Sequence, residues 1–178
     1  MLNKHFLDFI RLLESHKVEF VVVGGYAVGV HGFPRNTGNL DVFVAISREN
    51  ADRLIGAFKE FGFASLNLKP EDFLEADMVV EIGREPIKIQ VLTGIDGISF
   101  DRCRNDRILV DVSGTQIPFV GFDSLLANKA ASPRSKDRID LEELTPIRNL
   151  QQDRGIDREI DQARLRRVLQ VFKNPAPR

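Results

Sequence analysis

The chain has 178 residues, of which 43% are hydrophobic, so it is long enough for one domain with a substantial buried core. Its 25 Lys and Arg residues are balanced by 26 Asp and Glu residues, and the net charge is -1. This balance argues against a chain that is drawn to nucleic acid or to a membrane surface by its overall charge. We therefore expect a small-molecule site or a local protein site.

The cysteine content and the lengths of the apolar runs indicate the cellular compartment. The single cysteine, Cys103, cannot form an internal disulfide, and the three histidines have no metal-ligand spacing. No apolar run approaches the roughly 20 residues that span a bilayer, and the N-terminus has the pattern of an amphipathic helix rather than of a signal peptide. We expect a cytoplasmic protein with no membrane partner.

The first half of the sequence is predicted to be helix, strand, helix, strand, helix. The first helix has apolar residues at helical spacing, and the first strand is a β-branched run that a sheet buries on both faces. Ser47 is a candidate N-cap of the third helix, and Gly62 is placed to stop it. The expected elements are residues 3–15, 18–23, 26–30, 40–46 and, after Ser47, the helix that ends near Gly62.

The second half is predicted to contain two hairpins followed by helices. The hairpins are residues 78–82 with 87–92 and residues 108–112 with 116–120, each around a short turn. Helices are expected from residue 122, from 135 to 144 and from 156 to 172. No repeat or linker divides the chain. We expect residues 1–148 to form the main domain and residues 149–178 to form a helical extension and tail of the same domain.

Two glycines directly after the first strand are the first candidate binding feature. Gly24 and Gly25 let backbone N–H groups at a helix start approach an anion closely, and a triphosphate suits such a seat. Taken alone, such a pair is more often only a turn. The distance along the chain to Asp41, an acid on the next strand, favours the functional interpretation.

The segment Gly24 to Val44, GGYAVGVHGFPRNTGNLDVFV, resembles the nucleotidyltransferases of the DNA polymerase beta superfamily, in particular small bacterial and archaeal members. Their pattern is a Gly-Gly or Gly-Ser turn followed by Asp-x-Asp on the next strand. Two further stretches fit the same family: KIQVL at 88–92 with GISF at 97–100, and LLANKAASPRSKDRIDLEEL at 125–144. The resemblance implies an α/β (α+β) fold, with a mixed sheet flanked by helices and with C-terminal helices.

In that family, the two aspartates and a third carboxylate on a later strand hold two Mg²⁺ ions for nucleotidyl transfer. Here the Asp-x-Asp positions are Asn39-Leu40-Asp41, and the third position is Gln90. Amides bring neither charge nor a base, so Asp41 is left as the predicted metal ligand of the catalytic set Asp41, Asn39 and Gln90. We expect binding of a nucleoside triphosphate with Mg²⁺ or Mn²⁺, weakly held, and transfer that is weak or lost, as in a pseudoenzyme.

Several alternatives stay open at this point. An active Mg²⁺- or Mn²⁺-dependent transferase, related to toxin–antitoxin pairs, would use Asp41 with substitute ligands. Glu81, predicted to lie opposite Lys88 across the first hairpin, is a distant candidate substitute. A shift of register would bring in Asp96 or Asp101, and Asn39 could be an engineered change from aspartate.

Triphosphate contacts are predicted at Arg35, Lys88, Lys129 and Lys136, each of which also fits an ordinary surface charge or, for Lys129, the end of an apolar stripe. Thr37 is a further candidate, although loop threonines usually bond to local backbone. The acidic residues 137, 140, 142 and 143 are expected to form one solvated helix face. The acceptor, or a protein partner, is unspecified. A nucleic-acid partner is suggested only by the tRNA and DNA substrates of the resembled superfamily and by the arginines of the expected last helix, and the near-neutral charge argues against it.

Overall fold

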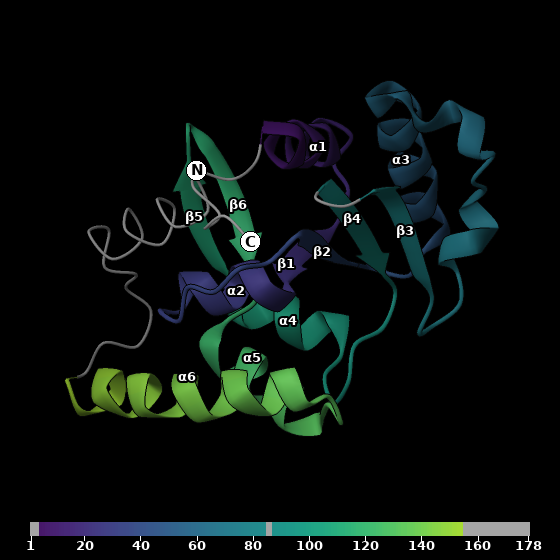
Figure 1. Cartoon of the computed structure of the whole chain (residues 1–178). Coiled ribbons are helices and arrows are strands. Elements are labelled where there is room, and N and C mark those ends of the chain that lie inside the picture. Colours follow the sequence, from purple (N-terminus) through teal and green to yellow (C-terminus); the bar gives the residue numbers. More distant parts are fainter. Residues whose placement is uncertain (1–3, 85–86, 155–178) are drawn as a thin grey trace.

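The computed structural model describes residues 4–84 and 87–154, and they form one mixed six-stranded sheet with helices on both faces (Figure 1). The strand order is β3-β4-β2-β1-β6-β5, so β3 and β5 are the edge strands. The strands are β1 (Phe20–Val23), β2 (Asn39–Val44), β3 (Val79–Arg84), β4 (Ile87–Leu92), β5 (Ile108–Val112) and β6 (Thr115–Phe119). Both predicted hairpins are present, as β3–β4 and β5–β6.

Two helices, α1 and α3, cover one face of the sheet, while α4, α5 and α6 lie on the other (Figure 1). Between α3 and β3 the chain makes three short helical turns, at Lys59–Phe63, Ala64–Leu66 and Pro70–Phe73. The helices are α1 (Lys4–Ser15), α2 (Gly24–Val30), α3 (Arg48–Phe58), α4 (Phe100–Asp106), α5 (Phe122–Ala131) and α6 (Ser135–Asp153). No helix within these described residues is both long and apolar enough to cross a membrane.

Local sequence explains the N-terminal layer. The Phe9 ring of α1 stacks on Phe58 of α3 with centroids 5.6 Å apart, which joins the two helices over the buried sheet face. Ser47 caps α3 by accepting from the Asn50 N–H at 3.1 Å, as its position predicted. The chain then turns at Gly62, whose φ of 100° is open to glycine and strained for other residues.

Helix assignments were less complete in the second half. The structure adds α4, which the sequence analysis did not predict; Ser99 caps it by accepting from the Arg102 N–H at 3.3 Å. Helix α6 continues past the expected end at residue 144 to Asp153, with Pro146 inside it. The helix predicted for residues 156–172 lies outside the described residues, and the division of the chain at residue 148 stays a prediction.

The register of the β3–β4 hairpin differs from the expectation by two residues. Glu81 pairs with Gln90, and not with Lys88, which lies opposite Gly83. The reason is that the ladder continues through residues 83 and 84, so the connecting turn is shorter than the four residues expected. A shift of two keeps Glu81 on the same face as Gln90 because side chains alternate along a strand.

Candidate functional site

A cleft of about 660 Å³ opens on the face of the sheet that carries Asp41, beside α5 and α6. It is lined by the end of β1, the start of α2, the loop before β2, parts of β2, β3 and β4, and the segment from α5 into α6. Nine of the ten predicted site residues line it, and Lys88 does not. The nine are Gly24, Gly25, Arg35, Thr37, Asn39, Asp41, Gln90, Lys129 and Lys136.

The glycine turn is needed because Asp41 and Thr37 approach its backbone closely. Gly24 has a φ of 66°, and a Cβ there would lie 1.9 Å from Asp41 Oδ2. A Cβ on Gly25 would lie 2.6 Å from Thr37 Oγ1. The Gly25 N–H donates a hydrogen bond to Asp41, so the strand's own carboxylate accepts from a backbone group that the sequence analysis had assigned to a phosphate.

Asp41 is the candidate site's most perturbed acid. Burial raises its pKa from 3.8 to about 6, against the lowering effects of Lys129, of the Gly25 hydrogen bond and of Lys136. Burial, and then the charge of Asp41, raise the pKa of the neighbouring Tyr26 to about 12. A carboxyl with a shifted pKa in a cleft is typical of functional sites. A cation bound beside Asp41 would favour the charged form of its carboxyl.

The two predicted amides form a hydrogen-bonded row across three strands, which we call the amide ladder: Asn39 of β2, Gln90 of β4 and Glu81 of β3. Asn39 Nδ2 donates to Gln90 Oε1 at 3.3 Å, and Gln90 Nε2 donates to Glu81 Oε2 at 2.9 Å. Lys88 closes the row through an ion pair with Glu81. Hydrogen bonds from Lys88 and Gln90 lower the pKa of Glu81. Lys88 is thus engaged at the outer end of the ladder and stands apart from the cleft.

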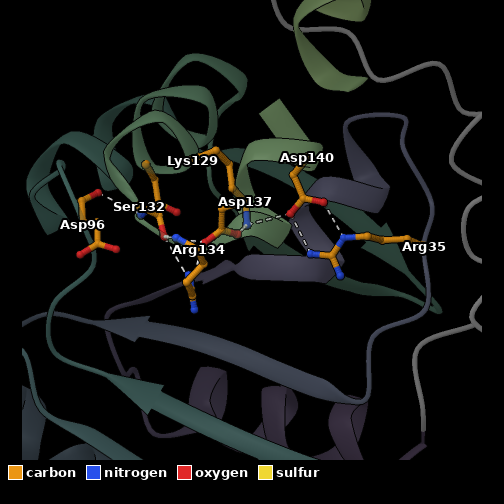
Figure 2. A network of polar contacts seen from close by, with 8 residues as sticks. Arg35, Asp96, Lys129, Ser132, Arg134, Asp137 and Asp140 are labelled. Atoms are coloured by element: carbon orange, nitrogen blue, oxygen red, sulfur yellow. Dashed lines mark hydrogen bonds and ion pairs between the residues drawn. The ribbon is translucent and has the colours of Figure 1, made fainter. Parts of the chain in front are cut away.

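The opposite wall of the cleft carries a network that we call the ion cluster: Arg35, Lys129, Arg134, Asp137 and Asp140 (Figure 2). Arg35 donates to both oxygens of Asp140, through Nε at 2.6 Å and Nη2 at 2.8 Å. Lys129 Nζ pairs with Asp137 and lies 2.9 Å from Asp140 Oδ2. Arg134 Nε donates to Asp137 Oδ2 at 2.6 Å. Burial acts to raise the pKa values of both carboxyls, but the hydrogen bonds and charges of these cations, together with a hydrogen bond from Ser132 to Asp137, outweigh it and lower them.

The ion cluster corrects the predicted solvated acidic face and accounts for the position of Lys129. Asp137 and Asp140 are 2% and 0% exposed, so the prediction of a single solvated acidic face is wrong for them, although residues 142 and 143 are exposed. The cause is that buried cations from two other segments need counter-charges. Lys129 is 3% exposed and sits between both carboxylates, so it is a buried partner of α6 rather than a solvated charge.

Lys136 differs from the other cations of the cleft. Its side chain is exposed, and it has no ion-pair partner among the described residues. Its partial burial at the edge of the cleft, and then the nearby charge of Arg35, lower its pKa, while the charges of Asp140 and Asp41 act to raise it. Thr37 donates from Oγ1 to the Asn39 carbonyl at 3.3 Å, which is the local backbone bond that loop threonines commonly make.

The donor set limits what metal could be held here. Within the described residues, no three His, Cys, Asp or Glu side chains are grouped so as to bind a metal ion. The amides of Asn39 and Gln90 are bonded to each other, and Asp41 is the one carboxylate at the three positions that the sequence resemblance indicated. This set does not fit two ions held by the protein. It does fit one Mg²⁺ that keeps its waters and takes its other anionic ligands from phosphates.

Sequence reasoning missed Arg134, Asp137 and Asp140 as parts of the site. A signal for the two aspartates exists: the buried residues of α6 are Asp137, Asp140, Leu144 and Arg148, which follow helical spacing. The stripe was overlooked because three of its four members carry charges.

Two solved structures share the architecture of this chain. A protein of Thermotoga maritima that is proposed to be a nucleotidyltransferase superposes with a TM-score of 0.52 at 16% identity, covering 87% of this chain and 96% of that one. The lincosamide antibiotic adenylyltransferase LnuA, solved with lincomycin bound, superposes with a TM-score of 0.51 at 12% identity, covering 82% and 98%. No protein-family model matches the sequence, and no curated protein is similar to it.

Proposed function

We propose a nucleotide-binding function for this chain, which has the nucleotidyltransferase fold that its sequence resemblance implied. On this premise, the cleft binds a nucleoside triphosphate together with Mg²⁺ or Mn²⁺, and transfer of the nucleotide to an acceptor is weak or lost. The protein would act as a nucleotide-responsive binding module toward an acceptor or protein partner that is still to be identified.

The observation that carries this proposal is the bond between Asn39 and Gln90. Two-metal nucleotidyl transfer uses one ion to activate the attacking oxygen and another to balance charge on the triphosphate. The two amides that replace the family's carboxylates are joined by one hydrogen bond of 3.3 Å, and they present no negative charge to a second ion. The ion that would activate an acceptor therefore has no anionic ligand at these positions.

Binding of the triphosphate is supported by the charges on the other wall of the cleft. Arg35 and Lys129 are paired with buried carboxylates, which offset their charge, so their contribution is to fix the wall. Lys136 and Arg134 line the cleft and are placed to contact phosphate oxygens. Arg134 uses Nε for its ion pair with Asp137, and its side chain is 69% exposed. Asp41 would hold the single metal that the triphosphate brings, and that ion would balance charge on the phosphates.

The test combines binding with transfer. ATP, GTP, CTP and UTP are titrated calorimetrically into the protein with Mg²⁺, with and without EDTA, and the same nucleotides, radiolabelled, are incubated with cell extract to detect labelled acceptors. We expect binding of at least one nucleotide and no labelling. The double variant N39D/Q90D is expected to gain labelling. Absence of binding by all four nucleotides, with or without metal, would overturn the proposal.

Glu81 supports a second candidate, an active transferase with substitute ligands. Its Oε2 lies 2.9 Å from Gln90 Nε2, so a carboxylate stands directly beside the position of the lost one. If this acid ligates a metal, labelling by the unmodified protein with Mn²⁺ should be detectable. It should then be abolished by both Glu81→Gln and Asp41→Asn, and unaffected by Glu142→Gln on the exposed side of α6.

A further inference from the structure

The sheet face that forms the floor of the cleft and its surroundings carries a polar row and an apolar row. In the polar row, Glu81, Gln90 and Asp41 are register partners on neighbouring strands. Two residues further along the sheet and on the same face, Val79, Leu92 and Phe43 are register partners and form the apolar row. Phe43 is covered by the Phe100 ring, with centroids 5.3 Å apart. The outer part of the apolar row is left uncovered.

We call this uncovered part the apolar shelf: Val79 of β3, Leu92 of β4 and Ile95 in the loop after β4. All three line the cleft. Val79 is 51% exposed, and the other two are partly buried against the core. A branched apolar side chain open to a cleft, next to a polar row, has surface available that a ligand could bury.

The shelf is rigid because the ends of its strands are tied together. Thr93 Oγ1 accepts from the Met78 N–H at 2.9 Å and donates to the Glu75 carbonyl at 2.6 Å. The loop that carries Ile95 is held to α5 by Asn128 Nδ2, which donates to the Asp96 carbonyl at 2.9 Å. A preformed surface of this kind binds a ring without first having to be ordered.

The amide ladder beside the shelf has hydrogen-bonding capacity left over. Each amide nitrogen carries two hydrogens, and the structure uses one of those on Asn39 Nδ2 and one of those on Gln90 Nε2. No described residue donates to Asn39 Oδ1. The ladder therefore offers donors and an acceptor without net charge on either amide, whereas the cations of the cleft belong to the opposite wall.

We propose that the apolar shelf and the two amides form a subsite for an uncharged, ring-bearing group with a polar edge, and that Lys136 and Arg134 take the phosphates at the other wall. A nucleobase and a small ring-bearing acceptor share this chemistry. The ring lies on Val79, Leu92 and Ile95, and its polar edge bonds to Asn39 and Gln90. This inference rests on the proposed function, because it assumes that the phosphates occupy the cationic wall.

The experiment uses Val79→Asn, with Leu109→Asn as its matched control. Leu109 is also an exposed apolar residue on an edge strand, at 59%, but on β5 at the far edge of the sheet. Calorimetry compares ATP, GTP, CTP and UTP with inorganic tripolyphosphate, which has no ring. In a second arm, adenosine, guanosine, cytidine and uridine are titrated into the ATP-saturated protein.

If the ring is the nucleobase, at least one nucleotide binds about tenfold more tightly than tripolyphosphate, and Val79→Asn removes that advantage while tripolyphosphate affinity stays within about twofold. If the ring belongs to a separate molecule, a nucleoside binds the ATP-saturated protein and Val79→Asn abolishes this second event. Leu109→Asn changes neither. Equal affinity for nucleotides and tripolyphosphate, together with no nucleoside binding, overturns the subsite and leaves the proposed function standing. No binding of nucleotide or tripolyphosphate removes both.

Discussion

The two walls of the cleft treat charge in opposite ways. On the α5–α6 wall, Asp140 is 0% exposed and Lys129 is 3% exposed, and each has oppositely charged partners within hydrogen-bonding distance. On the sheet wall, at positions equally central to the cleft, Asn39 and Gln90 carry amides that are bonded to each other. Buried charge is retained on one wall and absent from the other.

This difference separates charge that holds the fold together from charge that would hold a metal. A buried ion pair can be lost only at a large cost in stability, since removing one partner leaves the other charge unpaired. A carboxylate facing an open cleft is costly to keep when no metal is bound, because it adds repulsion between neighbours. Under the proposed function, the sheet wall is where a metal site can be lost without harming the fold. Asp41 lies on the sheet wall and is influenced by the charges of Lys129 and Lys136 on the helical wall.

Removing Asp140 should have the largest effect, because it breaks the closed wall. Asp140→Ala leaves Arg35 and Lys129 short of a buried counter-charge, and we expect a loss of about 3 to 5 kcal/mol in the free energy of unfolding. Urea denaturation measures it. Glu143→Ala, at an exposed position on the same helix, should stay within about 0.5 kcal/mol. A loss below about 1 kcal/mol for Asp140→Ala would show that the ion cluster does not hold the wall.

Asp41→Asn should stabilise the protein, in a way that depends on pH. The folded-state pKa of Asp41 is raised from 3.8 to about 6, so its stability contribution is full below pH 3.8 and is lost as pH rises through 6. At pH 8 the ionised carboxylate carries a penalty of at most about 3 kcal/mol, which the variant removes. In EDTA, its urea midpoint should exceed the parent's at pH 8 and match it near pH 4.

The matched control for this prediction is Asp52→Asn, on the exposed side of α3. It should shift the free energy of unfolding by less than about 0.5 kcal/mol at any of these pH values. If Asp41→Asn destabilises the protein at pH 8, Asp41 belongs with the structural charges of the ion cluster, and the contrast between the walls is lost.

The double variant N39D/Q90D should make the sheet wall dependent on metal. It places one new carboxylate at position 90, between its cross-strand partners Asp41 and Glu81, and another at position 39, two residues before Asp41 on β2. Without metal we expect a loss of about 1 to 2 kcal/mol from like-charge repulsion and from the broken amide bond. Millimolar Mg²⁺ should recover it, since a ligand at 100 times its Kd stabilises by about 2.7 kcal/mol. An equal Mg²⁺ response in the parent, measured by thermal unfolding, would contradict the claim that the amides removed a metal site.

The sequence predicted most elements, and it located the sheet wall better than the helical wall. Strands β1, β2 and both hairpins have strong β-branched patterns. Strand alternation predicts Asn39 and Asp41 on one face, and the family resemblance adds Gln90 to them. Helix α4 was missed because its seven residues include only two apolar ones, too few to show a helical stripe.

The prediction for the helical wall was wrong for a different physical reason. Asp137 and Asp140 were predicted to be solvated because acids are rarely buried, and the burial of Asp140 depends on Arg35, more than 100 residues away in the sequence. Long-range pairs of this kind leave no local pattern. The strand order, in which β1 lies between β2 and β6, likewise depends on contacts that periodicity does not encode.

The smallest effect distinguishes two lysines that were both predicted to contact phosphate. Lys136 lines the cleft without an ion-pair partner among the described residues, while Lys88 is paired with Glu81 outside the cleft lining. Lys136→Ala should weaken triphosphate binding about tenfold, corresponding to about 1.4 kcal/mol, and Lys88→Ala by less than about twofold. Calorimetry at low and high salt measures both, and the effect of Lys136→Ala should shrink at high salt because an exposed charge is screened. Equal effects of the two variants would mean that the phosphates reach the outer end of the amide ladder, so that the sheet wall, and not the helical wall, receives them.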